Sequence, residues 1–262
     1  MILVTGATGF VGSKILKSCK NTIACPSLRN ATEDDIKRII FENPIDTIIH
    51  TAAIADIGEC EKNPEESYLA NVQIPIYLAR ASKGIKLICF SSDQVYSGFG
   101  KGGPFTEEKV KPGNLYAKHK LEMENRVLEI DPNAVMLRAQ WMYDYYLKKS
   151  NYLMGILNEN QSVCYSSRQF RGITYLKEVA QNMEAVAKLE GGAYNFGSET
   201  TKSMYEITKE FLASIGKKIS LVDNEYENNL WVDCTKAKKG GVIFNSVEDG
   251  LRECARDYGL LK

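Results

Sequence analysis

The sequence predicts an α/β fold built on a doubly wound parallel sheet, followed by a small C-terminal lobe. Three observations lead to this prediction. Short apolar, β-prone runs alternate with amphipathic segments, a glycine-rich turn joins the first run to the first amphipathic segment, and the pattern becomes less regular after about residue 145. Repeated strand–helix units imply parallel strands that are joined by right-handed crossovers.

The first half of the chain follows this pattern most clearly. The expected strands are 1–4, 22–25, 46–50, 86–92 and 134–139, and the expected helices are 10–19, 32–42, 65–82 and 116–130. Residues 93–115 contain many Gly, Pro, Lys and Glu residues and therefore predict a loop.

The second half predicts shorter elements. We expect helices near 148–158, 176–189, 203–215 and 246–257, with strands near 161–165, 193–196 and 219–222. No linker of distinctive composition separates the two halves. We therefore expect a main domain at 1–145 and a lobe at 146–262 that interleaves with the end of the sheet.

Composition excludes several classes of protein. Lys plus Arg and Asp plus Glu both number 33, which gives no support to a nucleic-acid or membrane partner and leaves a homodimer open. The seven cysteines form no C-x-x-C, so we expect neither a disulfide framework nor a metal site. No stretch is long and apolar enough to be a signal peptide or a transmembrane helix, and we expect a cytoplasmic protein.

The segment "VTGATGFVG" contains the strongest local motif. Gly6, Gly9 and Gly12 follow a strand and begin a helix, which is the context that the dinucleotide fingerprint of Rossmann-type folds requires, although their spacing is G-x-x-G-x-x-G and not the commoner G-x-G-x-x-G. Such glycines let the backbone turn tightly and approach a pyrophosphate, which then lies at the helix N-terminus. The alternative is a glycine-rich turn that only packs the helix on the strand. We expect 1–145 to be an NAD(P)-binding domain.

The region after the second strand indicates which coenzyme is bound. Sites that prefer NAD usually have an acid there to hold the ribose hydroxyls. The sequence "NTIACPSLRN" has no acid, whereas Ser27 and Arg29 offer the hydroxyl and the cation that a 2′-phosphate needs. We expect NADP(H), with NAD(H) left open. The alternative is that Arg29 is a solvated loop residue.

Tyr116 and Lys120 are four residues apart, so a helix places them on one face. A neighbouring ammonium stabilises a phenolate, and we expect it to lower the tyrosine pKa. Such a tyrosine can exchange a proton with a carbonyl or hydroxyl oxygen. Ser92, at the end of the strand 86–92, should face the same crevice, because ligands bind at the carboxyl ends of parallel strands.

With these motifs in place, the chain resembles the extended short-chain dehydrogenase/reductases, and within them the dTDP-4-dehydrorhamnose reductases. The matching segments are "TGATGFVG", "IIHTAA", "YLANVQIP", "FSSDQVYSG" and "PGNLYAKHKLEME", in family order over about the first 145 residues. The likeness continues more weakly through "LRAQWMYD", "RQFRGITYLKEVAQNM" and "GGAYNFGSETTKSMYEI". The resemblance implies that NADPH reduces a keto group at carbon 4 of a nucleotide-linked deoxysugar.

The resemblance also assigns roles to individual residues. It implies that Ser92, Tyr116 and Lys120 are catalytic and that Asp93, Trp141 and Arg171 face the substrate. The residues implied to bind the coenzyme are Gly6, Thr8, Gly9, Phe10, Val11, Gly12, Ser27, Arg29, Ala52, Ala53, Asn71, Tyr116 and Lys120. The alternatives are an ordinary core aromatic for Trp141 and a surface cation for Arg171.

The chain departs from the family pattern at several places. It reads S-S-D-Q-V-Y where the reductases usually read S-T-D-Y-V-F. The reductases also have an acid in an early "V-D" pair; this chain has Gly58 at the aligned position, and its own acid, Asp56, lies two residues earlier. We expect His119, on another face of its helix, to be solvated. We expect His50 to border the coenzyme or to pack, not to catalyse.

Three other functions were compared with the reductase. A dehydratase of the same fold needs a carboxylate base after the aspartate, but this chain has Gln94, and an amide is no such base. An epimerase uses the same Ser-Tyr-Lys set with NAD, which the absence of a ribose-binding acid disfavours. A non-catalytic, NADP-binding regulatory subunit would need no catalytic set, although all three residues are present here.

Overall fold

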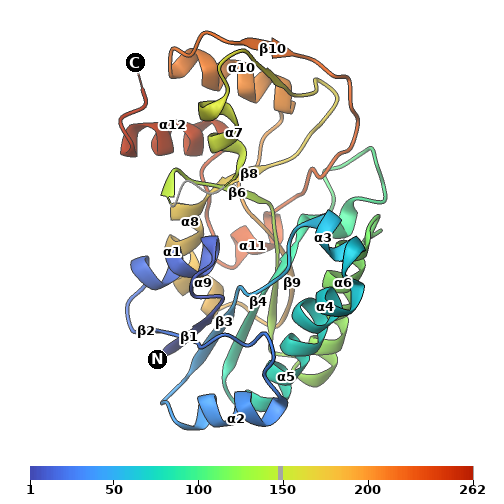
Figure 1. Ribbon diagram of the computed structural model, residues 1–262, viewed down its shortest axis with the longest axis vertical. Coiled ribbons are helices and arrows are strands. Elements are labelled where there is room, and N and C mark those ends of the chain that lie inside the picture. The colour runs from blue at the N-terminus through green and yellow to red at the C-terminus, as the bar shows by residue number, and fades with distance from the viewer. Residues whose placement is uncertain (147–149, 262) are drawn as a thin grey trace.

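The computed structural model describes residues 1–146 and 150–261. A six-stranded parallel sheet forms its centre and confirms the predicted Rossmann-type α/β fold (Figure 1). In spatial order the strands are β2 (Thr22–Ala24), β1 (Ile2–Thr5), β3 (Thr47–His50), β4 (Lys86–Ser92), β5 (Val135–Ala139) and β9 (Gly192–Phe196). All six were expected from the apolar runs, within one or two residues at their ends.

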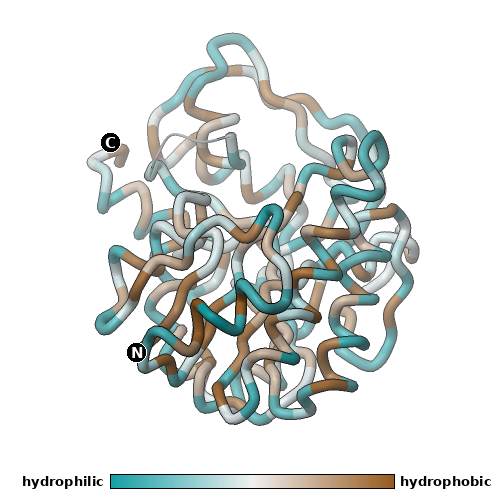
Figure 2. The backbone as a smooth tube through the Cα atoms, turned by 60° about the horizontal axis from the view of Figure 1, so that its bottom comes forward, coloured by the Kyte–Doolittle hydropathy of each residue, from teal (hydrophilic) through white to brown (hydrophobic). Residues whose placement is uncertain are grey.

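Both faces of the sheet are covered by helices, which makes the fold doubly wound. One face carries α1 (Phe10–Ser18), α8 (Leu176–Gln181), α9 (Met183–Ala187) and α11 (Thr235–Lys239). The other carries α2 (Glu33–Phe41), α5 (Ile74–Ala81) and α6 (Leu115–Ile130). Side chains alternate between the two layers, since Ile88 packs with the first set and Leu87 with the second. Figure 2 shows hydrophobic and hydrophilic segments alternating along the backbone.

A lobe lies above the carboxyl ends of the strands (Figure 1). It contains two small parallel sheets, β6 (Trp141–Tyr143) with β8 (Ile173–Tyr175) and β7 (Ser162–Cys164) with β10 (Ser220–Val222). Helices α7 (Tyr152–Asn158), α10 (Met204–Ser214) and α12 (Val247–Asp257) surround them, and Tyr152, Phe211 and Leu251 belong to their common apolar core.

Some elements differ from the expectation. The expected helix 65–82 is α4 (Pro64–Tyr68), a π-helical turn η1 (Leu69–Gln73) and α5, and the expected helix 176–189 is divided into α8 and α9. The expected loop 93–115 begins with a short 3-10 turn, η2 (Asp93–Tyr96). Helices α3 (Ile57–Lys62) and α11 and strands β6 and β8 were not expected; β6 begins two residues after β5 ends and β8 continues directly into α8, so no turn residues separate these strands from their neighbours. Part of the expected helix 148–158 lies outside the described residues.

The strand order determines where a ligand can enter. From β1 the chain moves to β2 on one side and then crosses to β3 on the other, so a crevice opens between the carboxyl ends of β1 and β3. The segments that follow these strands are tied together there, because Thr51 Oγ1 donates a hydrogen bond to the Thr5 carbonyl at 2.7 Å. No helix of the described chain is long and apolar enough to cross a membrane.

Candidate active site

The glycine-rich turn after β1 has no space for a side chain at Gly6 or Gly12. Gly6 has a φ of +65°, and a Cβ built there would lie 2.8 Å from the Ala52 nitrogen. A Cβ on Gly12 would lie 2.4 Å from the Gly6 carbonyl oxygen. Gly9 caps α1 without a side-chain hydrogen bond, so the first amides of the helix remain available. A pyrophosphate group fits such a helix start, where backbone amides and the helix dipole favour an anion.

Two pockets lie on either side of this turn and share Ala53. The smaller pocket, ≈ 290 Å³, has walls that come mainly from the turn and from the segments after β2 and β3, with Glu66 of α4 at one side. Its lining includes Gly6, Thr8, Ser27, Arg29, Ala52, Ala53, Glu66 and Ile74. Together the two pockets provide separate spaces for the two ends of a dinucleotide, one for the adenosine and the other for the nicotinamide.

Arg29 is not an isolated cation in this pocket. Its Nε lies 3.0 Å from Glu66 Oε1, and Nη2 bonds the same oxygen. This ion pair raises the pKa of Arg29. Glu66 belongs to α4, whereas sites that prefer NAD usually have their ribose-binding acid in the segment after β2. No pattern in the sequence singled out Glu66.

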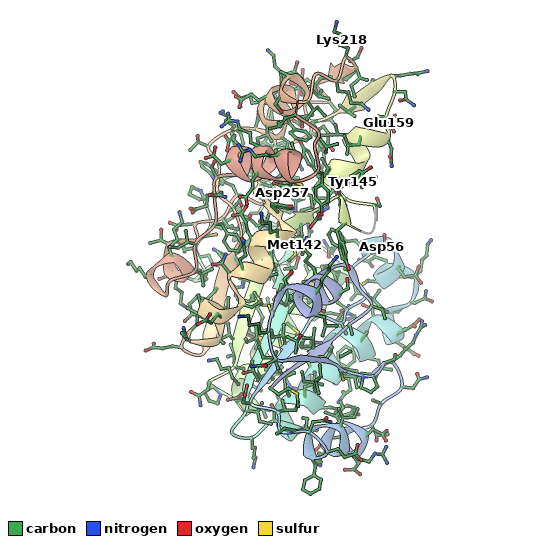
Figure 3. The ribbon with its side chains drawn as sticks, turned by 90° about the vertical axis from the view of Figure 1, so that its left-hand side faces the viewer. Asp56, Met142, Tyr145, Glu159, Lys218 and Asp257 are labelled. Atoms are coloured by element: carbon green, nitrogen blue, oxygen red, sulfur yellow. The ribbon has the colours of Figure 1, made fainter. Side chains whose placement is uncertain are left out.

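The larger pocket is a cleft of ≈ 490 Å³ between the sheet and the lobe. Figure 3 shows Met142 and Tyr145, from the lobe, and Asp56, which precedes α3, around this junction. The predicted residues that line the cleft are Phe10, Val11, Ala53, Ser92, Asp93, Tyr116, Lys120, Trp141 and Arg171. The fold therefore brings the three predicted catalytic residues and the three predicted substrate residues to one cavity.

Tyr116 and Lys120 project from α6 into the floor of the cleft. Lys120 Nζ donates a hydrogen bond to the Phe90 carbonyl at 2.8 Å and lies 5.8 Å from the centre of the Tyr116 ring. Burial lowers the pKa of Lys120 to about 8. The expectation that Lys120 lowers the tyrosine pKa is not met, since burial raises the pKa of Tyr116 against the opposing hydrogen bond with Ser92. Tyr116 is therefore a protonated phenol at neutral pH.

The position of Tyr116 depends on how α6 begins. The Asn114 side chain accepts a hydrogen bond from the Ala117 amide at 2.8 Å and caps the helix. Glu61, at the end of α3, accepts from the Leu115 amide at 2.9 Å. These two acceptors fix the first turn, which carries the tyrosine. Asn114 was noted in the sequence as part of the motif, whereas Glu61 gave no local pattern.

The substrate side of the cleft has a buried ion pair. Asp93 Oδ2 lies 2.9 Å from Arg171 Nη2, and the Arg171 guanidinium lies 5.4 Å from the Trp141 ring centre. Burial raises the pKa of Asp93, and Arg171 opposes that shift. Trp141 is 37% exposed and faces the cleft, so it is not an ordinary core aromatic.

Three other expectations are resolved by the packing. His119 is buried and its Nδ1 lies 2.9 Å from Ser67 Oγ, so the expectation of a solvated side chain was wrong. His50 Nδ1 and Thr5 Oγ1 form a hydrogen bond of 2.8 Å, and burial lowers the pKa of His50 to about 3. Asn71 is fully buried, and its amide oxygen and nitrogen hold the Ile54 backbone in the wall of the smaller pocket. In the described part of the chain, no cluster of His, Cys, Asp and Glu could hold a metal.

This fold, with serine, tyrosine and lysine gathered at the switch point of the sheet, defines an extended short-chain dehydrogenase/reductase. The chain belongs to the RmlD substrate-binding domain family, whose pattern matches residues 1–234.

Two curated relatives illustrate the range of this family. The dTDP-4-dehydrorhamnose reductase of Aggregatibacter actinomycetemcomitans is 26% identical over 223 residues, covering 78% of this chain and 76% of its own. Methionine adenosyltransferase 2 subunit beta of Xenopus tropicalis is 30% identical over 233 residues, covering 79% of this chain and 69% of its own.

Solved structures agree on the fold. A dTDP-4-dehydrorhamnose reductase from Clostridium acetobutylicum superposes with a TM-score of 0.86 at 21% identity and covers 98% of this chain and 99% of its own. The Bacillus anthracis dTDP-4-dehydrorhamnose reductase in complex with NADP has a TM-score of 0.85 at 20% identity, with 98% of each chain covered.

Proposed function

We propose that this protein reduces a 4-keto group on a nucleotide-linked deoxysugar with NADPH, in the manner of dTDP-4-dehydrorhamnose reductases. The observation that carries the proposal is the cleft in which Ser92, Tyr116 and Lys120 face Asp93, Trp141 and Arg171. Family membership and the reductase relatives support the same reaction.

The coenzyme site fits the residues around the glycine turn. The amides at the start of α1 would hold the pyrophosphate, Thr8, Ala52 and Ala53 would line the adenosine side, and Ser27 and Arg29 would meet the ribose phosphate. When bound, the coenzyme supplies a hydride to the carbonyl carbon. NADH remains an alternative donor, because the same pocket contains Glu66.

The residues of the chain then complete the reduction. The Ser92 hydroxyl holds the carbonyl oxygen, and the Tyr116 phenol gives that oxygen its proton, which yields the alcohol. The Lys120 ammonium stabilises the phenolate left on Tyr116 until water returns the proton. Burial keeps the Tyr116 phenol protonated but also raises its pKa and makes it a weaker acid, so the reaction depends on the Lys120 ammonium to stabilise the phenolate as it forms.

The substrate residues have complementary roles. Trp141 offers an exposed ring on which the sugar can pack, and Arg171 offers a cation near the nucleotide diphosphate. Arg171 is already paired with Asp93, so the ion pair also orients the guanidinium.

The structure supports a reductase over a dehydratase. In the position of the dehydratase base, Gln94 carries an amide whose Oε1 accepts a hydrogen bond from Asn114 at 3.2 Å. An amide held in this way cannot remove a proton from carbon. The second candidate function is a coenzyme-binding subunit without turnover, favoured by the relatives that are named as a methionine adenosyltransferase subunit.

One experiment separates these functions. Purified protein is mixed with NADPH and a dTDP-4-keto-6-deoxysugar, and coenzyme oxidation is followed by absorbance while the sugar product is identified by mass spectrometry. Oxidation with formation of the 4-hydroxy sugar supports the reductase. Tight NADPH binding without oxidation, over a panel of 4-keto sugar nucleotides, would replace the reductase by the binding subunit.

We also propose that the protein works in the cytoplasm. All seven cysteines are free thiols, as a reducing compartment favours.

Zero formal net charge leaves little repulsion between copies, and we propose a homodimer as the assembly to be tested by sedimentation.

A further inference from the structure

The adenosine-side pocket has one feature that the proposed reaction does not use, the carboxylate of Glu66. Glu66 belongs to α4, whereas Arg29 belongs to the segment between β2 and α2, which runs across the molecule toward the helices α4 and α5 (Figure 1). Both side chains line the same pocket beside Thr8 and Ser27. A group that enters this pocket therefore meets a cation and an anion together.

The two charges are directly paired. Arg29 Nε lies 3.0 Å from Glu66 Oε1, and Nη2 contacts the same oxygen. The Arg29 side chain is 73% exposed and that of Glu66 is 38% exposed, so the pair is accessible from the pocket and from solvent. Because it is exposed, the pair can rearrange when a ligand arrives, at a small cost in free energy.

The pair affects the two nicotinamide coenzymes in opposite directions. A 2′-phosphate is attracted by the guanidinium but repelled by the carboxylate, which also competes with it for the arginine donors. Ribose hydroxyls are neutral donors, and a carboxylate accepts hydrogen bonds from them, as the acid after the second strand does in NAD sites. In this chain no acid occurs between Asn21 and Ala31, and α4 supplies one from elsewhere in the sequence.

We propose that Glu66 is a selectivity residue whose negative charge lowers the preference of the site for NADPH over NADH. The inference rests on the coenzyme class of the proposed function but not on the identity of the sugar. Glu66 acts on the adenosine end of the coenzyme, away from the Tyr116 cleft, so its effect belongs to binding and leaves the proton transfer unchanged.

The test measures dissociation constants for NADPH and NADH by coenzyme fluorescence, without sugar substrate. Glu66→Gln should raise the ratio Kd(NADH)/Kd(NADPH) by about 3- to 10-fold. The increase should be larger at low than at high ionic strength, because salt screens exposed charges. Arg29→Ala should lower the same ratio. Glu65→Gln removes the same charge from the next position of α4, outside the pocket lining, and should leave the ratio unchanged.

The outcomes distinguish the inference from the proposed function. An unchanged ratio in Glu66→Gln, or the same change in Glu65→Gln, would overturn the role of Glu66 while leaving the reductase intact. Glu66→Asp retains the negative charge, so its ratio Kd(NADH)/Kd(NADPH) should stay nearer that of the unchanged protein than the ratio of Glu66→Gln does. This variant keeps the test valid if Glu66→Gln is unstable. If the unchanged protein binds neither coenzyme, the proposed function fails together with this inference.

Discussion

Arg171 holds the buried carboxylate of Asp93 in an ion pair, with 2.9 Å between Nη2 and Oδ2, although 78 residues separate the two in the chain. Asp93 follows β4 of the main sheet, and Arg171 precedes β8 of the lobe. The pair therefore joins the two parts of the molecule across the cleft in which the substrate is expected.

Asp93→Asn should weaken both the fold and substrate binding. Removal of one partner from a buried ion pair leaves a charge without compensation and should lower the free energy of unfolding by about 3 kcal/mol. Arg171 would lose its orientation, so KM for the sugar nucleotide should rise about tenfold, the effect of ~1.4 kcal/mol. Denaturant unfolding and steady-state kinetics measure these changes, with the exposed Asp223→Asn as control. Equal stability of the two variants would contradict the structural role of the pair.

Tyr116→Phe tests the proton donor. Since only the hydroxyl is removed, kcat should fall by about 10²- to 10⁴-fold while the Kd for NADPH stays within about twofold. Stopped assays give kcat, and coenzyme fluorescence gives Kd. Tyr226→Phe removes a hydroxyl from a ring that is 53% exposed and should change neither value. Retention of most of the activity in Tyr116→Phe would exclude this tyrosine as the donor.

The pH dependence of stability should report Lys120. Its pKa is lowered from 10.5 to about 8 by burial, so between these values the unfolded chain binds more protons than the folded chain. The free energy of unfolding contributed by this group therefore rises with pH from about 8 to 10.5 and is constant below and above that window. Buried cysteines and tyrosines with raised pKa values oppose this rise, so the measured quantity is the difference in free energy of unfolding between the unchanged protein and Lys120→Met, which urea unfolding at several pH values should show increasing over this window.

The same shift predicts how activity depends on pH. Above pH about 8 Lys120 loses the charge that stabilises the phenolate, so kcat/KM should fall on the alkaline side with an apparent pKa near that value. A profile that stays flat well beyond this pH would contradict the assigned role of Lys120.

Asn114→Ala tests how the start of α6 positions Tyr116. Loss of the cap to the Ala117 amide should lower the free energy of unfolding by about 1 kcal/mol and reduce kcat several-fold. Asn114→Ser retains an oxygen acceptor at the cap and should recover most of both losses. If the serine variant is as impaired as the alanine variant, the hydrogen bond from Asn114 to Gln94 matters more than the cap.

Local patterns in the sequence were sufficient for the central architecture. The apolar runs of β1, β3 and β4 and the glycine turn after β1 act over a few residues, so the class of fold and the coenzyme turn follow from them, whereas the order of the strands came from the structure. The strands β6 and β8 were missed because no turn residues separate them from β5 and α8, and they pair with each other although about thirty residues lie between them in the chain.

Long-range packing determined the features that were missed or wrong. His119 was expected in solvent because it lies on another helix face than Tyr116 and Lys120, yet α4 covers it with Ser67 and Tyr68. The Tyr116 pKa was expected to fall beside Lys120, yet burial of the phenol has the larger effect.

The sequence by itself determined the class of fold, the glycine turn and the Tyr116–Lys120 pair, because each depends on residues that are close in the chain. Only the tertiary structure decided that Arg171 pairs with Asp93 and that Glu66, 37 residues from Arg29, lies against it in the pocket beside Thr8 and Ser27. These relationships arise from contacts between distant segments, and burial then sets the charge state of the groups that meet there.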